Sequence, residues 1–443
     1  MASVENQLRL FSKDGSLCKL ETRITRVGDR LEIPEGLHTI PCTHGLHRFP
    51  GKFIPNLPRY LVRQYLQSLN GDVVIDPFCG SGTTLVELAL EGRTFVGLDF
   101  DPLAILISKA KTTLLPDEIL SEFLDAWRGF DYSEERSDLF PDVPNLRHWF
   151  TETALAELSA IKGQCLEFRE PLRTFALAVF SSIIRRVSNA DDQTQKTYVS
   201  HTLPKTPPKP HELFPVFAQR ALDGMGEYGS LLSSTVRGKI VKGDARCDVE
   251  QHEFVHVLTS PPYIDSIDYM YNQMLEYFWL LPELGIDSYD CFRKMRRDPM
   301  GFRLHDPEEI EEELRNSLGD EFDVLQSVCS EIVLKSPKES AAVMSFFYDY
   351  LTHLKKTRDQ QITNGYYLCV IGNSLIRGVQ VPTVDILCGM FKGLGYKIED
   401  VLRYEIRRHY MKFPRRGNSG KIKTDYVIVA KLSKWISAGS QAT

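Results

Sequence analysis

Short apolar segments recur along the chain, and several are followed by a segment with helical spacing. The segment 73–76 ends in a glycine-rich turn, and a helix is expected over 83–91. The segment 94–99 follows, and a second helix is expected over 102–111. Pro102 suits a helix start because its φ is fixed and it lacks an N–H donor. Strands that alternate with helices predict a parallel sheet covered on both faces, in the α/β class.

This alternation is interrupted twice. Residues 116–235 have a mostly helical pattern, and residues 281–337 form a second irregular stretch after an apolar segment. A long helix is expected over 340–356. Further strands are expected over 239–241, 254–258, 366–371, 399–407 and 426–431, the last two as an antiparallel pair. The pattern therefore predicts one seven-stranded sheet with two insertions, not a row of separate domains.

The composition excludes several classes of protein. Of 443 residues, 42% are hydrophobic and 25% are charged, which is ordinary for a globular protein and unlike a collagen, a coiled coil or a disordered chain. No run of 18 apolar residues predicts a membrane span, and the first residues do not resemble an export signal, so we expect a cytoplasmic protein. The nine cysteines are scattered, odd in number and never spaced as CxxC, which favours reduced thiols without a zinc site.

The first chemical motif is DPFCGSGTT over residues 76–84, between a strand and a helix. Gly80 and Gly82 allow a sharp turn and a close approach of the backbone to a ligand. Free N–H groups at the start of the helix can hold an anionic group. Asp99 ends the next strand, where a carboxylate can accept hydrogen bonds from ribose hydroxyls. A nicotinamide site would have a third glycine at position 85, where the chain has Leu85, so a different nucleoside cofactor is expected.

The second motif is TSPPY over residues 259–263, directly after an apolar strand. Consecutive prolines force extended backbone and remove two N–H donors. The carbonyls of Ser260 and Pro261 and the hydroxyl of Ser260 can therefore accept hydrogen bonds from a planar amine. Tyr263 offers a flat face for stacking. A strand that merely ends at prolines is the alternative interpretation of this motif alone.

Together these segments resemble motifs I and IV of the amino-group DNA methyltransferases, which use S-adenosylmethionine. The SPPY form resembles the N4-cytosine branch, whereas the N6-adenine branch usually has DPPY. HGLHRFPGKF over 44–53 resembles motif X, and KGDA over 242–245 resembles motif III. The order here is X, I, III, IV, whereas many SPPY enzymes place motif IV before motifs X and I. The resemblance covers about 41–112, 239–280 and 340–432.

The resemblance implies a class I methyltransferase fold, Rossmann-like with largely helical insertions, and a set of site residues. The cofactor residues are expected to be Lys52, Phe53, Asp76, Phe78, Gly80, Gly82, Thr83, Thr84, Asp99, Phe100, Asp244 and Ser260. The catalytic residues are expected to be Ser260, Pro261, Pro262 and Tyr263. No metal is expected, since His44 and His47 have no other ligands near them in the sequence. The product would be S-adenosylhomocysteine.

A local basic cluster lies over 403–423, which contains eight Lys or Arg residues and one acid, Glu405. The chain as a whole has a net charge of −6, so the cluster is a candidate phosphate-binding region. A solvated charged loop is the alternative. The residues expected to contact DNA are Arg407, Arg408, Lys412, Arg415, Arg416, Lys421 and Lys423, with Arg296 and Arg297 in the second insertion.

These observations predict the following organisation. An N-terminal extension (1–40) precedes a catalytic core in three parts (41–115, 236–280 and 338–443). The insertion 116–235 is the candidate target-recognition region, and the insertion 281–337 is a candidate DNA-contacting region.

The predicted activity is methylation of the N4 amine of cytosine in double-stranded DNA, as part of a restriction–modification or related defence system with a separate endonuclease. Two alternatives are N6-adenine methylation and a DNA-binding component with a vestigial cofactor fold. An RNA or protein-amide methyltransferase is a further rival. The base must leave the duplex to reach such a site.

Overall fold

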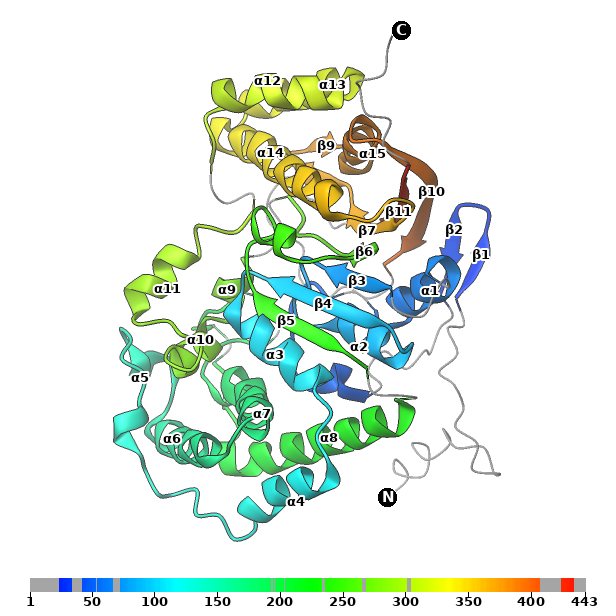
Figure 1. Ribbon diagram of the computed structural model, residues 1–443. Coiled ribbons are helices and arrows are strands. Elements are labelled where there is room, and N and C mark those ends of the chain that lie inside the picture. Colours follow the sequence, from blue (N-terminus) through cyan, green and yellow to red (C-terminus); the bar gives the residue numbers. More distant parts are fainter. Residues whose placement is uncertain are drawn as a thin grey trace, which may run out of the picture.

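The computed structural model describes residues 24–433 except 34–41, 53, 67–71, 193, 195, 203, 233–235, 265–267, 301–303 and 407–423. One large sheet crosses the molecule in the strand order β1-β2-β10-β11-β7-β6-β3-β4-β5 (Figure 1). The seven expected strands are β3 (Val73–Asp76), β4 (Thr94–Asp99), β5 (Gly238–Lys242), β6 (His256–Thr259), β7 (Tyr366–Gly372), β10 (Tyr396–Glu405) and β11 (Thr424–Leu432).

The five adjacent strands β7, β6, β3, β4 and β5 are parallel, and β11 runs antiparallel to both of its neighbours, β7 and β10. This is the class I methyltransferase sheet expected from the sequence. The strand order reverses between β3 and β6, which lie side by side. Ligands of open α/β sheets bind beyond the carboxyl ends of the strands at such a switch point.

The sheet has two more strands than expected. A hairpin of β1 (Thr25–Val27) and β2 (Arg30–Glu32) extends the β10 edge, where Arg30 pairs with Arg403. Each strand has only three residues, and five of the six are exposed. Such strands lack the apolar pattern that reveals a buried strand, so they could not be predicted from the sequence.

The sheet separates two hydrophobic cores, because neighbouring residues of a strand point to opposite faces. In β3, Val74 belongs to one core and Ile75 to the other. The first core is covered by α1 (Asn56–Tyr65), α2 (Thr83–Leu90) and α3 (Pro102–Thr112). The second is covered by α12 (Pro307–Leu318), α13 (Asp320–Val333), α14 (Pro337–Gln360) and α15 (Thr383–Gly393).

The first insertion is helical, as expected, and extends the first core. It contains α4 (Asp117–Ala126), α5 (Leu146–Trp149), α6 (Glu152–Glu167), α7 (Leu172–Val187) and α8 (Pro210–Leu231). Helix α7 is buried along most of its length and contacts α3, α6, α8 and α10 (Met274–Leu280). The insertion is therefore packed against the sheet domain and does not form a separate unit (Figure 1).

The second insertion divides between two places. Helix α11 (Tyr289–Met295) packs beside α10, where Phe292 contacts Tyr277, whereas α12 and α13 pack against α14 and α15. The short elements that remain are η1 (Cys42–Gly45), η2 (Ser137–Leu139), η3 (Asp248–Gln251), α9 (Tyr269–Asn272), β8 (Ser374–Ile376) and β9 (Val379–Val381). Within the described part of the chain, no helix combines the length and the apolar character needed to cross a membrane.

Candidate active site

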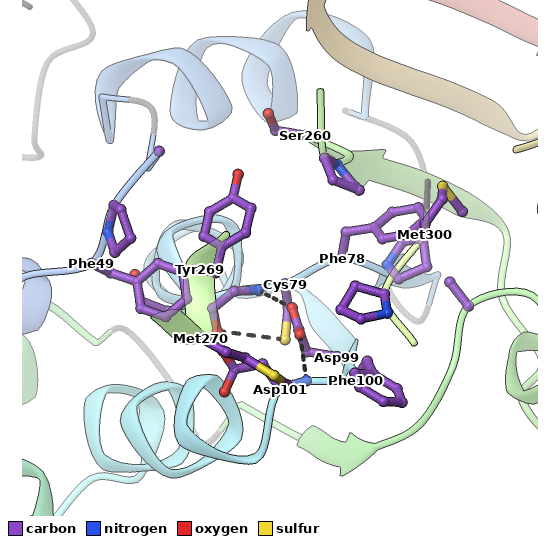
Figure 2. Close-up of a pocket in the computed structure, with 18 of the residues that line it drawn as sticks. Phe49, Phe78, Cys79, Asp99, Phe100, Asp101, Ser260, Tyr269, Met270 and Met300 are labelled. Atoms are coloured by element: carbon purple, nitrogen blue, oxygen red, sulfur yellow. Dashed lines mark hydrogen bonds between the residues drawn. The ribbon is translucent and has the colours of Figure 1, made fainter. Parts of the chain in front are cut away.

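A cavity opens at the carboxyl ends of the central strands, at the switch point of the sheet (Figure 2). Its walls come from the segment before α1, from the loop after β3, from the ends of β4 and β5, and from the segment after β6. The expected site residues found in its walls are Lys52, Asp76, Phe78, Gly80, Thr83, Asp99, Phe100, Asp244, Ser260 and Pro262. The structure thus brings the segments resembling motifs X, I, III and IV to one place.

The loop after β3 is held by Asp99. The Gly80 N–H donates to Asp99 Oδ2 at 2.7 Å, and the Asp101 N–H donates to Oδ1 at 2.9 Å. Each carboxylate oxygen keeps a further lone pair, so Asp99 can hold the loop and still accept a bond from a ligand hydroxyl. Burial raises the pKa of Asp99 to about 7, and the neighbouring Asp101 contributes in the same direction.

Gly82 and Thr84 do not line the cavity, although both were expected to bind the cofactor. Gly82 has φ of +78°, and a Cβ there would lie 2.9 Å from Cβ of Ser108 in α3. Glycine is therefore required at position 82 to pack the loop against α3. At Gly80, with φ of +50°, a Cβ would meet only the Phe49 ring at 3.5 Å.

The cavity walls suit a nucleoside that carries a charged tail. The hydroxyls of Ser81 and Thr83 are buried in the wall and have no hydrogen-bond partner among the described residues. Unpaired buried hydroxyls are costly, so these two are available to a ligand. Phe78, Phe100 and Met300 lie together on one side of the cavity, where they offer an apolar surface to a heterocycle (Figure 2).

Lys52 is a cation in the cavity wall. Its Nζ donates to the carbonyl of His44 at 2.8 Å, and burial lowers its pKa to about 8. A largely charged amine at neutral pH can hold a carboxylate. Phe53, its predicted neighbour in the site, lies outside the described residues.

Asp244 is already paired with a cation. Arg246 Nη2 lies 2.6 Å from Asp244 Oδ2, and its Nη1 lies 3.1 Å from Asp349 Oδ2 in α14. Arg246 also donates to the carbonyl of Asp298 at 2.8 Å, and it lines the cavity. The sequence did not identify Arg246, because its second partner lies 103 residues further along the chain.

The two motif loops are joined by a buried hydrogen bond. The Thr259 hydroxyl donates to Asp76 Oδ1 at 2.6 Å, so the end of β6 is tied to the end of β3. Burial raises the pKa of Asp76 to about 6, although the bonds from Thr259 and the Phe78 N–H oppose the change. Ser260 follows directly and faces the cavity, whereas Pro261 is buried behind it.

Tyr263 does not line the cavity. Its hydroxyl donates to Asp425 Oδ1 at 3.0 Å, and the Tyr404 hydroxyl donates to Oδ2 at 3.0 Å. Burial raises the pKa of Asp425 to about 6, with the two tyrosine hydroxyls opposing it. Asp425 and Tyr404 are paired residues of β11 and β10, so two strands fix the position of the last residue of the TSPPY motif.

Tyr269 lies in the cavity wall, six residues after Tyr263. Its ring stacks on that of Phe49, with the centroids 6.0 Å apart and the planes 23° apart. Tyr269, Tyr271 and Tyr277 lie close together in the sequence, where aromatic residues can equally belong to the core. Tyr277 does prove to be buried, with its hydroxyl on Asp101 Oδ1 at 2.5 Å. Only the fold separates the roles of these tyrosines.

His44 and His47 serve the core. His44 Nε2 lies 2.8 Å from Glu87 Oε1, and Glu87 is also bonded by Arg59. His47 Nε2 lies 2.9 Å from the Ser181 hydroxyl. Burial lowers the pKa of both imidazoles, that of His47 to about 3. No group of three or more His, Cys, Asp or Glu side chains that could hold a metal ion occurs among the residues described.

Most of the expected DNA-contacting residues, Arg407, Arg408, Lys412, Arg415, Arg416, Lys421 and Lys423, lie outside the described residues. Arg297 is exposed in the second insertion. Arg296 is already engaged, since it pairs with Asp268 at 2.5 Å, lies over the Tyr271 ring at 4.9 Å and lines the cavity. With Pro299 and Met300, it brings part of the second insertion into the cavity wall.

Comparisons with known proteins agree with this geometry. The N6/N4 methyltransferase family model, described as DNA methylase, matches residues 29–110. The chain is 28% identical to the type II methyltransferase M.MvaI of Kocuria varians over 414 residues, 87% of each chain. It is 44% identical over 68 residues to the type II methyltransferase M.MjaII of Methanocaldococcus jannaschii, 15% of this chain and 12% of that protein.

A shorter similarity concerns a protein that acts on RNA. The chain is 38% identical over 80 residues to a tRNA (guanine(10)-N2)-dimethyltransferase of Methanocaldococcus jannaschii, 17% of this chain and 22% of that protein. The cavity, the loop held by Asp99 and the similarity over most of the chain to M.MvaI agree on one cofactor, S-adenosylmethionine. The family model over residues 29–110 and the similarity to M.MvaI over 87% of the chain both support the S-adenosylmethionine-dependent amino-methyltransferases, the family of the N6/N4 DNA methylases.

Proposed function

We propose that this protein methylates the N4 amine of cytosine in double-stranded DNA. The observation that carries the proposal is the shared cavity, whose wall contains Asp99 of the cofactor loop and Ser260 of the SPPY segment. The serine form of this segment favours cytosine over adenine. The similarity to a type II methyltransferase over 87% of the chain supports DNA as the substrate.

The chain supplies orientation and hydrogen-bond acceptors. Asp99 can accept from the ribose, Lys52 can hold the carboxylate, and Phe78, Phe100 and Met300 can cover the adenine. When bound, S-adenosylmethionine supplies an electrophilic methyl group on a sulfonium.

An exocyclic amine is a poor nucleophile because its lone pair is conjugated with the ring. Ser260 Oγ and the Ser260 or Pro261 carbonyl accept hydrogen bonds from the amine, which concentrates the lone pair on nitrogen. Acceptors that are already in position lower the barrier most, because they need no reorganisation during the reaction. The Thr259–Asp76 bond supports this placement by fixing the end of β6 beside the cofactor loop.

We further propose that the methylation belongs to a restriction–modification system with a separate endonuclease. The insertion 116–235 remains our candidate for target recognition, with DNA contacts from the 403–423 cluster and from Arg297. The family resemblance predicts that Tyr263 stacks on the flipped base. In the structure the Tyr263 hydroxyl donates to Asp425, and this bond would have to be kept or broken when a base enters.

Base-resolution mapping of methylation in a host without other methyltransferases tests the proposal. Cells that express the wild-type protein should gain N4-methylcytosine at one sequence, and cells that express Ser260→Ala should not. Mass measurement of nucleosides from the same DNA separates N4-methylcytosine from N6-methyladenine. If the DNA contains N6-methyladenine, the target base is adenine and not cytosine. If the DNA is unmodified, the proposal is overturned.

A further inference from the structure

Two tyrosines after the SPPY segment differ in what their hydroxyls contact. The Tyr263 hydroxyl is held by Asp425, which is 7% exposed and bonded by Tyr404 on its other oxygen. Breaking this arrangement would leave a buried carboxylate with one donor fewer, which is costly. Tyr263 is thus held outside the cavity wall by two other strands.

Tyr269, in contrast, faces the cavity. Figure 2 shows its ring beside Phe49 and its hydroxyl directed toward Ser260, with Asp99 and Phe100 on the other side of the ring. The ring therefore stands between the region of the cofactor and the acceptors for the target amine.

The backbone around Tyr269 is well supported. Tyr269 is the first residue of α9, whose N-cap Asp268 accepts from the Tyr271 N–H at 2.8 Å. Asp268 also pairs with Arg296 at 2.5 Å. Phe49, only 9% exposed, supports the ring from behind. A rigid ring at a cavity wall can stack without losing much conformational freedom on binding.

We propose that Tyr269 is the residue whose ring and hydroxyl contact the base that receives the methyl group. This inference rests on the proposed function, since it assigns a residue to the target base. Aromatic stacking suits any base because every base has a π-face. A phenol can donate to a ring nitrogen such as N3 of cytosine, next to the reacting amine. Burial raises the pKa of Tyr269 to about 12, so the hydroxyl keeps its proton at neutral pH.

The experiment compares Tyr269→Leu, Tyr269→Phe, Tyr263→Leu and Tyr271→Phe with the wild type. Tyr271 is a matched control, because it lies on the same helix and its hydroxyl donates to the Thr197 carbonyl. The single-turnover methylation rate is measured on an oligonucleotide with the mapped target site, at saturating protein and cofactor. Calorimetry gives the affinity of each variant for S-adenosylmethionine.

Tyr269→Leu should lower the rate by about tenfold to a hundredfold, from the loss of base stacking. Tyr269→Phe should recover most of the loss, and Tyr271→Phe should stay near the wild type. The affinity for the cofactor should change by less than about threefold in Tyr269→Leu. Tyr263→Leu should cost less rate than Tyr269→Leu.

Two results would overturn the inference. One is a wild-type rate in folded Tyr269→Leu. The other is a loss of cofactor affinity as large as the loss of rate, which would make Tyr269 a cofactor contact. If the wild type methylates another polymer and no DNA, the proposed function fails. The same variants measured on that polymer then decide the role of Tyr269 separately.

Discussion

The two sides of the cavity, which we propose to hold the cofactor and the target base, are built in different ways. On the cofactor side, Gly80, Asp99 and Asp101 contact one another through backbone N–H groups within a stretch of 22 residues. Outside the cavity wall on the base side, Tyr263 of the TSPPY segment is fixed by Asp425, 162 residues away. The contacts on the cofactor side can form as soon as one βαβ unit has folded, because their residues are close in the chain. The contacts on the base side need strands from the far end of the chain to be in place. Substitutions elsewhere in the chain should therefore disturb the geometry of the cofactor side less than that of the base side.

The largest expected effect is on the base side, in the chemistry. Ser260→Ala removes one acceptor for the target amine and should lower the methylation rate by about a hundredfold, comparable with the loss of one preorganised hydrogen bond in other enzymes. Because the interaction matters most in the transition state, the affinities for cofactor and DNA should change little. Rapid-quench kinetics with binding titrations separates the two quantities. Equal losses of rate and affinity would show that Ser260 only builds the site.

The next effect tests the cofactor side. Asp99→Ala removes the ribose acceptor together with the partner of the Gly80 and Asp101 N–H groups. The affinity for S-adenosylmethionine should fall by about tenfold to a hundredfold. Asp99→Asn, which keeps one acceptor oxygen, should fall less. Calorimetry measures both, and unchanged affinity in the folded alanine variant would contradict the assignment of Asp99.

A smaller effect concerns the pH dependence of cofactor binding. Burial lowers the pKa of Lys52 to about 8, so the amine is charged below that pH and neutral above it. The charged fraction of this amine falls about tenfold between pH 7 and pH 9. The attraction that we propose between Lys52 and the cofactor carboxylate should therefore be present at pH 7 and mostly lost at pH 9. The α-amino group of the ligand titrates in the same range. Calorimetry should therefore compare the affinity for S-adenosylmethionine of the wild type and of Lys52→Met across pH 6–9. An equal dependence of this affinity on pH in the two proteins would exclude Lys52 from the site.

The smallest expected effect concerns the basic cluster at 403–423. Replacing Arg415 and Arg416 with Ala should weaken DNA binding for all sequences and reduce the salt slope by about two, if both contact phosphate. Binding titrations between low and physiological salt give the slope. Replacement of the exposed pair Lys392 and Lys397, which lies outside the candidate DNA-contacting segments, is a control with the same loss of charge. If the salt slope of DNA binding is unchanged when Arg415 and Arg416 are replaced, the cluster does not contact phosphate and is a solvated loop.

The sequence predicted the cofactor side in more detail than the base side, because the contacts of the cofactor side are between residues close together in the chain. The strand, the two glycines and Asp99 lie close together in the chain, so their geometry follows from local rules. Arg246 and Tyr269 are different, because Arg246 depends on Asp349 and Tyr269 on Phe49. Contacts between such distant residues cannot be read from spacing.

The fold itself was predictable where strands are buried and apolar, as in β3 and β7. It was not predictable at β1 and β2, whose residues are mostly exposed. Gly82 illustrates a third case. The sequence marked a glycine for its close approach to a ligand, and the structure gives a separate reason for glycine there, the packing of the loop against Ser108 in α3.

The hydrogen bond between Thr259 and Asp76 constrains how such a sequence can diverge. The carboxylate is 2% exposed and the hydroxyl is fully buried. Loss of the acid would leave the buried hydroxyl without this acceptor, and loss of the hydroxyl would take one donor from a buried carboxylate that keeps its bond from the Phe78 N–H. Lineages that lose the hydroxyl should therefore also replace the acid, or gain a new donor beside it. The two positions, 183 residues apart, are expected to vary together across relatives of this chain.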